Sequence, residues 1–254
     1  MLIDTHTHLY AKQFDEDRSE MIQRALELGV EHFFLPNIDI ESIEGMYALE
    51  QAYPGKMHAM MGLHPCSVGA DYQDVLGQIK AEIDRRSFVA IGEIGMDLYW
   101  DKTYRKEQEK AFLTQVEWAE ELDLPIIIHS RETTQILIDI LKSYGPGRSR
   151  GIFHCFGGTY EEAKQIIDLG FDLGIGGVLT FKKSGLSEVV EKIPLEHLVL
   201  ETDSPYLAPT PKRGKRNESA FIQHIAQKLA DIKEVPLEVL SKITSENALR
   251  IFQI

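Results

Sequence analysis

The sequence has little cysteine, no long apolar run and a deficit of basic residues. Two cysteines in 254 residues, Cys66 and Cys155, exclude a disulfide framework and are typical of a reducing compartment. No stretch approaches the roughly 18 apolar residues of a membrane span. The N-terminus also lacks the basic segment that precedes the apolar run of a signal peptide. We therefore expect a cytoplasmic protein with no membrane partner.

The shortage of positive charge limits the ligands that the chain can bind. Lys and Arg number 27 against 40 Asp and Glu, which gives a formal net charge of −13. Such a charge repels polyanions and argues against broad, sequence-independent coating of nucleic acid. A phosphate-containing substrate would need local positive charge, from metal cations or from a basic loop.

The chain also lacks internal divisions. No Gly/Ser-rich linker, low-complexity tract or fixed-length repeat interrupts it, so we expect a single domain over residues 1–254. Short segments rich in Ile, Val and Phe alternate with longer amphipathic ones, which is typical of β-α units on a parallel sheet. The expected strands are 2–8, 31–37, 57–64, 88–95, 125–130, 151–156, 171–177 and 197–203. Eight such units in this length predict an α/β fold, a single (β/α)8 TIM barrel.

Histidines and carboxylates fall at the C-terminal ends of these strands. An isolated H-x-H such as His6 and His8 is more often a polar strand edge than a metal site. On a strand the two would share a face with Asp4, because alternate residues point the same way. Further candidates end other strands, and in a barrel these ends converge on one mouth, where active sites of this fold lie. The full set is His6, His8, His64, Glu93, His129, His154 and Asp203.

With His64 held aside, four imidazoles and two carboxylates suit one or two divalent ions of the Mg, Mn or Zn kind. A pair of ions usually shares a carboxylate, and Glu93 is the expected bridge because it comes from the middle of the barrel sequence. The remaining ligands would divide into His6, His8 and Asp203 for one ion, and His129 and His154 for the other.

A series of segments resembles the TatD-like metal-dependent deoxyribonucleases of the amidohydrolase superfamily. The resemblance implies that the same six residues are metal ligands and that His64 contacts the substrate phosphate. Cys66 stands where the family often has His, and Ser219 where it commonly has Pro. The fourth-strand segment contains no lysine, which argues against the related branches that use a carboxylated lysine as bridge. The segments are DTHTHL (4–9), GLHP (62–65), GEIGMD (92–97), IHSR (128–131), HCFGG (154–158), ETDSPYL (201–207) and RGKRNES (213–219).

The expected reaction is hydrolysis of DNA phosphodiester bonds by a metal-activated water. Catalytic roles fall to Glu93, to Asp203 as a ligand that can accept the water proton, and to His64 as phosphate contact or leaving-group donor. A barrel mouth admits a strand end more readily than a duplex, so we expect an exonuclease or a nuclease that prefers single strands. Two alternatives stay open: a hydrolase of another ester, amide or lactone, and a non-catalytic metal or nucleotide binder.

Four basic residues outside the predicted metal ligands each have two possible roles. Arg131 can hold a phosphate oxygen in bidentate fashion or form a surface salt bridge with Glu132. Arg213, Lys215 and Arg216 lie in the loop after the eighth strand, and they either contact phosphate or form a solvated loop.

A few other side chains near the strand ends carry weaker expectations. Tyr99 and Trp100 either stack on a base or pack within their loop. Glu201 is expected to orient a ligand, and Asn217 to cap the helix that follows it. The two cysteines are expected to fill space around the mouth, with a soft metal ligand as the alternative for Cys66.

Overall fold

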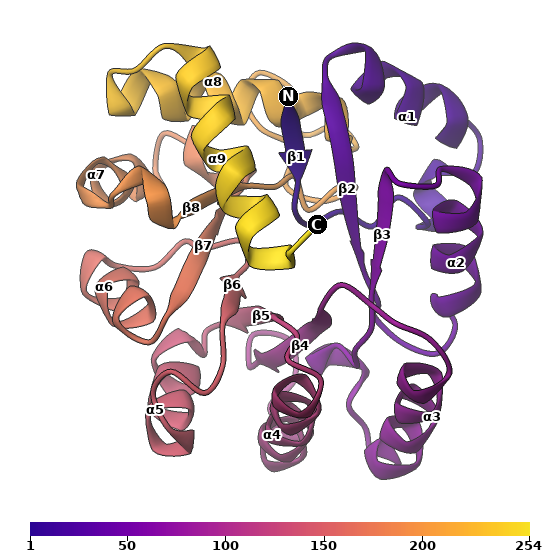
Figure 1. The fold of residues 1–254 in the computed structure, drawn as a ribbon. Helices are drawn as coiled ribbons and strands as arrows, with labels where there is room; N and C mark the ends of the chain where they lie inside the picture. The colour runs from indigo at the N-terminus through magenta and orange to yellow at the C-terminus, as the bar shows by residue number, and fades with distance from the viewer.

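Eight parallel strands alternate with helices around a ring in the computed structural model, which describes residues 1–254 (Figure 1). The strands are β1 (Leu2–Asp4), β2 (Val30–Pro36), β3 (Met57–Met60), β4 (Ile91–Asp97), β5 (Ile126–Arg131), β6 (Gly151–Phe153), β7 (Phe171–Ile175) and β8 (Leu198–Leu200). The helices are α1 (Arg18–Glu27), α2 (Ile43–Ala52), α3 (Tyr72–Arg85), α4 (Arg105–Glu121), α5 (Thr134–Tyr144), α6 (Tyr160–Asp168), α7 (Leu186–Lys192), α8 (Ile222–Lys233) and α9 (Leu237–Phe252). Short 3-10 segments are η1 (Lys12–Phe14), η2 (Pro65–Ser67), η3 (Gly177–Thr180), η4 (Leu195–His197) and η5 (Ser219–Phe221).

The strands form two parallel sheets, β1-β2-β3 and β4-β5-β6-β7-β8. Backbone hydrogen bonds continue the ring between them. The N–H of Gly92 donates to the Met61 carbonyl (3.0 Å), and the N–H of Thr5 donates to the Leu200 carbonyl (3.1 Å). The predicted (β/α)8 fold is confirmed, while the expectation of one domain over 1–254 stays a prediction.

All eight predicted strands exist, but several end before the histidines or carboxylates that were assigned to them. β1 ends at Asp4, so the prediction that His6 and His8 lie on a strand face with Asp4 is wrong. Their backbones instead pair with the loop after β8: the N–H of His8 donates to the Ser204 carbonyl (2.8 Å), and the N–H of Asp203 donates to the His6 carbonyl (2.9 Å). Residues 5–8 are buried although they lie outside the β-ladder, so their sequence still resembles that of a strand.

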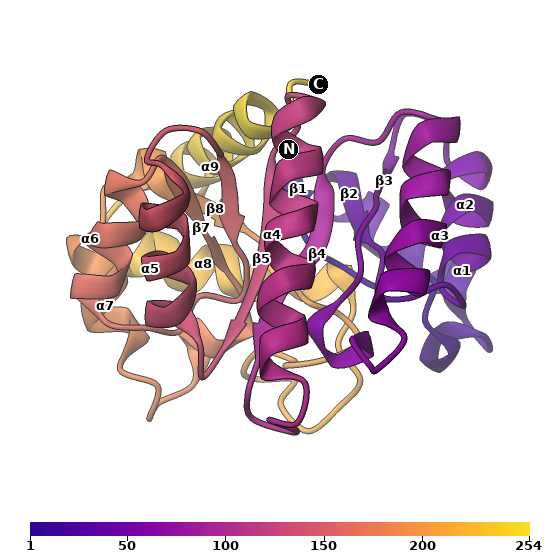
Figure 2. The same ribbon diagram turned by 90° about the horizontal axis from the view of Figure 1, so that it is seen from below.

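Apolar side chains fill the N-terminal end of the ring. There α9 packs across the strands, and the rings of Phe34 and Phe252 stack at 3.7 Å. Figure 1 shows α9 across this end, near both termini, and Figure 2 shows the loop between β8 and α8 at the opposite end. The predicted site therefore lies at the opposite, C-terminal end of the ring. The apolar cluster contains Ile3, Phe34, Met60, Ala90, Ile127, Ile152, Val199, Ala248, Ile251 and Phe252.

Helix α6 begins at a recognisable signal. A capping box starts α6, because the Thr159 hydroxyl accepts from the Glu162 N–H while the Glu162 carboxylate accepts from the Thr159 N–H.

No helix of this chain combines the length and the apolar character needed to cross a lipid bilayer.

Asn217 does not cap α8, which begins five residues later at Ile222. Its amide instead donates to the carbonyls of Thr202 (2.7 Å) and Tyr206 (2.6 Å). The prediction of an N-cap is wrong because a buried turn of the preceding loop competes for the same side chain.

Asp4 ties the first strand to the segments after β8. Its buried carboxylate accepts hydrogen bonds from the Thr202 N–H (2.9 Å), the Thr202 hydroxyl (2.6 Å) and the Ser219 hydroxyl (2.6 Å). These bonds join residues about 200 positions apart and hold the backbone on which His6 and Asp203 lie.

Replacing Asp4 with alanine removes the acceptor for all three donors. We expect Asp4→Ala to lower the free energy of unfolding by roughly 1–3 kcal/mol. Asp4→Asn keeps an acceptor for the Thr202 N–H and offers an N–H to a hydroxyl, so its loss is expected to be about 1 kcal/mol or less. Urea denaturation in EDTA measures both, and equal losses for the two variants would contradict this hydrogen-bonding role.

Candidate metal centre

The carboxylate of Glu93 lies at the centre of the site. Glu93 belongs to β4 and is 2% exposed. Imidazole nitrogens from other strand ends surround both of its oxygens. Oε1 lies 2.8 Å from His129 Nδ1, 2.9 Å from His154 Nε2 and 3.3 Å from His64 Nε2, whereas Oε2 lies 3.1 Å from His6 Nε2 and 3.6 Å from His8 Nε2.

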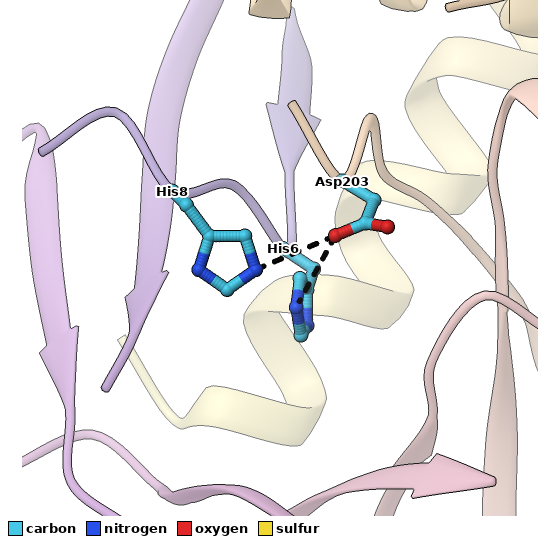
Figure 3. Close-up of side chains that lie close together, drawn as sticks. All are labelled: His6, His8 and Asp203. Atoms are coloured by element: carbon cyan, nitrogen blue, oxygen red, sulfur yellow. Dashed lines mark ion pairs between the residues drawn. The ribbon is translucent and has the colours of Figure 1, made fainter. Parts of the chain in front are cut away.

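Asp203 completes the cluster from the opposite end of the chain. Its Oδ1 lies 3.4 Å from His8 Nε2 and 3.8 Å from His6 Nε2, and both imidazoles point toward it (Figure 3). The backbone of Asp203 has a φ of 56°, a left-handed conformation that non-glycine residues rarely adopt. The tight bend that follows β8 therefore places this carboxylate beside His6 and His8.

All seven histidines and carboxylates predicted for the site converge at this end of the ring. Six of them line a cavity of about 730 Å³, and buried His6 lies directly beneath, its ring stacked on that of His154 at 3.8 Å. Three groups of side chains have donor atoms close enough together to hold an ion: His6, His8 and Asp203; His6, Glu93 and His154; and His64, Glu93 and His129.

For several of the imidazoles, neighbouring groups fix which nitrogen carries a proton. His129 Nε2 lies 2.9 Å from Asp97 Oδ2, so Nε2–H donates there and the Nδ1 lone pair faces Glu93. His8 Nδ1 lies 2.9 Å from the Tyr10 hydroxyl. That hydroxyl donates to the Pro36 carbonyl and must accept from His8, which leaves the Nε2 lone pair of His8 facing the carboxylates.

His154 faces Glu201 in a similar way, but at a longer distance that is not a hydrogen bond. The Nδ1 atom lies 3.5 Å from Oε1 of this fully buried carboxylate, and Nε2 faces Glu93. Oε1 of Glu201 also accepts the Cys155 N–H (2.7 Å). A Cβ at Gly174 would lie 2.2 Å from Glu201 Oε2, so only glycine leaves room for this side chain. The expectation that Glu201 orients a ligand agrees with this placement.

This donor set fits a divalent metal. Lone pairs of neutral imidazoles facing a carboxylate repel it unless a proton or a cation lies between them. Burial alone would raise the pKa of Glu93, but the imidazoles of His154, His64 and His6 hold that pKa well below its ordinary value. Burial alone would lower the pKa of His154, yet the carboxylates of Glu93 and Glu201 raise it well above 6.5.

His64 differs from the other imidazoles of the site. Its Nδ1 accepts the N–H of Cys66 (3.0 Å), so the neutral ring carries its proton on Nε2, 3.3 Å from Glu93 Oε1. Burial lowers the pKa of His64, which favours this neutral form. His64 therefore presents an N–H donor rather than a metal-binding lone pair.

Two orienting residues were missed by the sequence analysis. Asp97 lies on the same strand as Glu93, four residues on, and a period of two places both on one face. That spacing could have identified Asp97 from the sequence. No sequence pattern identifies Tyr10, because its role depends on the Pro36 carbonyl of another strand.

Arg131 is the one lysine or arginine that lines the cavity. Its guanidinium lies 3.8 Å from the ring centroid of Tyr99 and 5.2 Å from that of Trp100, and these aromatic rings are 50% and 72% exposed. The alternative salt bridge to Glu132 is not formed, since the ion pair of Glu132 is with Lys102 at 4.0 Å.

The basic loop after β8 does not reach the cavity. Arg216 makes a fork of two 2.7 Å bonds to Asp17, and these bonds lower the pKa of Asp17 to about 2. The guanidinium of Arg213 stacks on Phe181 at 4.0 Å. Neither they nor Lys215 line the cavity, so phosphate contacts of these three cations stay a prediction.

The two cysteines lie on the cavity wall, as expected for residues that fill space around the mouth. Burial raises the pKa of the Cys66 thiol to about 12. Cys66 belongs to none of the three groups whose donor atoms lie close enough together to hold an ion, so the geometry gives no support to the alternative of a soft metal ligand.

Comparisons with known proteins show the family to which the chain belongs. A "3'-5' ssDNA/RNA exonuclease TatD" from Pantoea ananatis is 31% identical and is matched over 99% of each chain. An "uncharacterized metal-dependent hydrolase YabD" from Bacillus subtilis is 40% identical over the whole of both chains. The crystal structure of the TatD homologue YJJV from Escherichia coli superposes with a TM-score of 0.93 at 30% identity, covering 100% of this chain and 98% of the other. The family described as TatD related DNase matches residues 3–253, and the chain belongs to this family, as the resemblance of its segments predicted.

Proposed function

We propose that this protein is a divalent metal-dependent hydrolase that cleaves phosphodiester bonds of DNA, as an exonuclease acting on single-stranded or end-bound substrate. The observation that carries the proposal is the ring of imidazoles and Asp203 around one buried carboxylate. Family membership supports it, as does the Pantoea ananatis relative named as a single-strand exonuclease. The cavity of about 730 Å³ accommodates a strand end more readily than a duplex.

The metal ligands are His6, His8, Glu93, His129, His154 and Asp203. The two oxygens of Glu93 support a shared role, because Oε1 faces His129 and His154 while Oε2 faces His6 and His8. Two ions, of Mg, Mn or Zn, would therefore share Glu93. Bound ions would supply positive charge against the phosphoryl oxygens and lower the pKa of a coordinated water from about 15.7 toward roughly 7 with zinc.

Other side chains of the cavity act on the substrate and on protons. Asp203 Oδ1 faces two imidazoles, which leaves Oδ2 to accept a proton from the attacking water. The Nε2–H of His64 donates to a phosphate oxygen or to the leaving group. Arg131 binds a nonbridging phosphate oxygen, and it brings positive charge to an otherwise acidic site.

Metal binding should release protons near neutral pH. Burial opposes protonation of His129, but hydrogen bonds to Asp97 and Glu93 raise its pKa, and the pKa of His154 is raised as well. An ion needs the lone pairs that these protons occupy, so the apparent affinity for Mn²⁺ should fall as the pH falls. Calorimetry at pH 7 in two buffers of different ionisation enthalpy measures the release. A binding enthalpy that is the same in both buffers would contradict this prediction.

Asp97→Asn tests the orientation of His129. Asp97 Oδ1 accepts the Tyr99 N–H (2.9 Å), so asparagine that keeps this bond turns its amide N–H toward His129 Nε2. The imidazole must then carry its proton on Nδ1, facing Glu93. We expect metal affinity to fall about 10–100-fold, measured by titration with Mn²⁺.

The matched control for this substitution is Asp139→Asn, at an exposed carboxylate on α5 that bonds only Gln135. Its metal affinity should equal that of the unaltered protein. An Asp97→Asn variant with normal affinity would overturn the assigned tautomer.

The proposed activity is tested with a single-stranded DNA oligonucleotide and protein reconstituted separately with Mg²⁺, Mn²⁺ or Zn²⁺. We expect stepwise shortening from an end with at least one ion, and a loss of about 100-fold or more in Glu93→Gln. Glu132→Gln, at an exposed carboxylate beside the cavity, is the control and should retain activity. Intact DNA with every ion, together with turnover of a lactone or carboxylic ester, would contradict the proposal.

A further inference from the structure

A second, smaller cavity opens beside the proposed metal cavity. Its volume is about 300 Å³, and it shares the side chains of Cys66, Asp97 and Trp100 with its larger neighbour. The segment around η2 forms one side, and the loop from β4 to the first turns of α4 forms the other. A ligand whose phosphate lies at Glu93 can therefore extend into this side cavity past the indole of Trp100.

The charge of the side cavity excludes a second phosphate. The charged side chains that line it are those of Asp97 and Asp101, both negative. No lysine, arginine or histidine lines it. Arg131, in contrast, lines only the larger cavity. A neutral group that donates hydrogen bonds fits the side cavity better than an anion does. Asp97 is buried and its oxygens already bond His129 and the Tyr99 N–H. The exposed carboxylate of Asp101 is therefore the acceptor for the exocyclic amino group of a base, as Asp and Glu are for cytosine.

Its shape and aromatic groups suit a flat ring. Trp100 is 72% exposed and lies at the junction of the two cavities, and Tyr104 lines the far side. A large exposed indole beside a hollow offers a stacking face, which is worth about 1–3 kcal/mol per base where it is used. The volume lies at the small end of the range of about 300–1,000 Å³ for ligand sites, which suits one base rather than a whole dinucleotide.

We propose that the side cavity is a nucleobase subsite: it receives one base next to the scissile phosphate, stacked on Trp100, with a preference for bases that carry an amino group. This inference rests on the proposed nuclease function and adds a determinant of substrate recognition. Trp100 binds the base and takes no part in the chemical step at Glu93.

The test compares single-stranded oligonucleotides that differ at one position. One substrate carries cytosine at every position, and two others carry an abasic residue at the terminal or at the penultimate nucleotide. For the unaltered protein, kcat/KM should fall about 10-fold for the abasic substitution at one of these positions, which corresponds to about 1.4 kcal/mol. Thymine at that position should also lower kcat/KM, because it lacks the amino group.

The variants then assign this preference to Trp100. In Trp100→Ala the ratio of natural to abasic kcat/KM should approach one, and Trp100→Phe should restore most of it. Leu122→Ala, at an exposed apolar side chain near the other end of α4, should keep the original ratio. A ratio that Trp100→Ala leaves unchanged would overturn the subsite, as would equal cleavage of natural and abasic strands by the unaltered protein.

The subsite and the proposed function fail in different ways. If the metal-loaded protein cleaves all the strands equally, the nuclease function stands and the base subsite is wrong. If it cleaves none of them, both proposals are overturned.

Discussion

The buried carboxylate of Glu93 is the constraint on which the site depends. Five imidazole nitrogens lie within 3.6 Å of its two oxygens, and neighbouring groups turn the lone pairs of several of them toward it. Such an arrangement is repulsive unless positive charge lies among the donors. Asp97 and Tyr10 oppose the alternative ring tautomers of His129 and His8, so the polarity of the site is fixed by residues that do not touch Glu93 themselves.

The fold determines where this constraint can be satisfied. Apolar side chains and α9 fill one end of the ring, so polar groups gather where the strands end. The segments after β1 and β8 leave the ladder there and pair with each other, and Asp4 holds them through the Thr202 and Ser219 bonds. The buried carboxylate of Asp4 therefore positions His6 and Asp203, which are nearly 200 residues apart.

The sequence predicted the number and order of the strands, and the convergence of seven side chains at their ends, because both follow from periodic patterns along the chain. It mispredicted where β1 ends, since the alternation of Thr and His over residues 5–8 continues a strand-like pattern beyond the ladder. The sequence did not determine the contacts of the basic loop, for another reason. Whether Arg216 meets phosphate or Asp17 depends on the position of α1, which no local pattern reports. Asn217 was mispredicted for a similar reason, because its amide donates to carbonyls of the preceding loop and does not cap a helix.

The protein has fewer basic than acidic residues, and several carboxylates line the cavity at the C-terminal end of the ring. Arg131 is the one permanent cation on the cavity wall, so the proposed metal ions would balance the remaining carboxylates and a bound phosphate. The central claim is that two ions share Glu93. Anomalous diffraction from crystals grown with Mn²⁺ tests it most directly. The account predicts two peaks roughly 3.5–4 Å apart, one beside each oxygen of Glu93. A single peak, or peaks that do not contact Glu93, would contradict it.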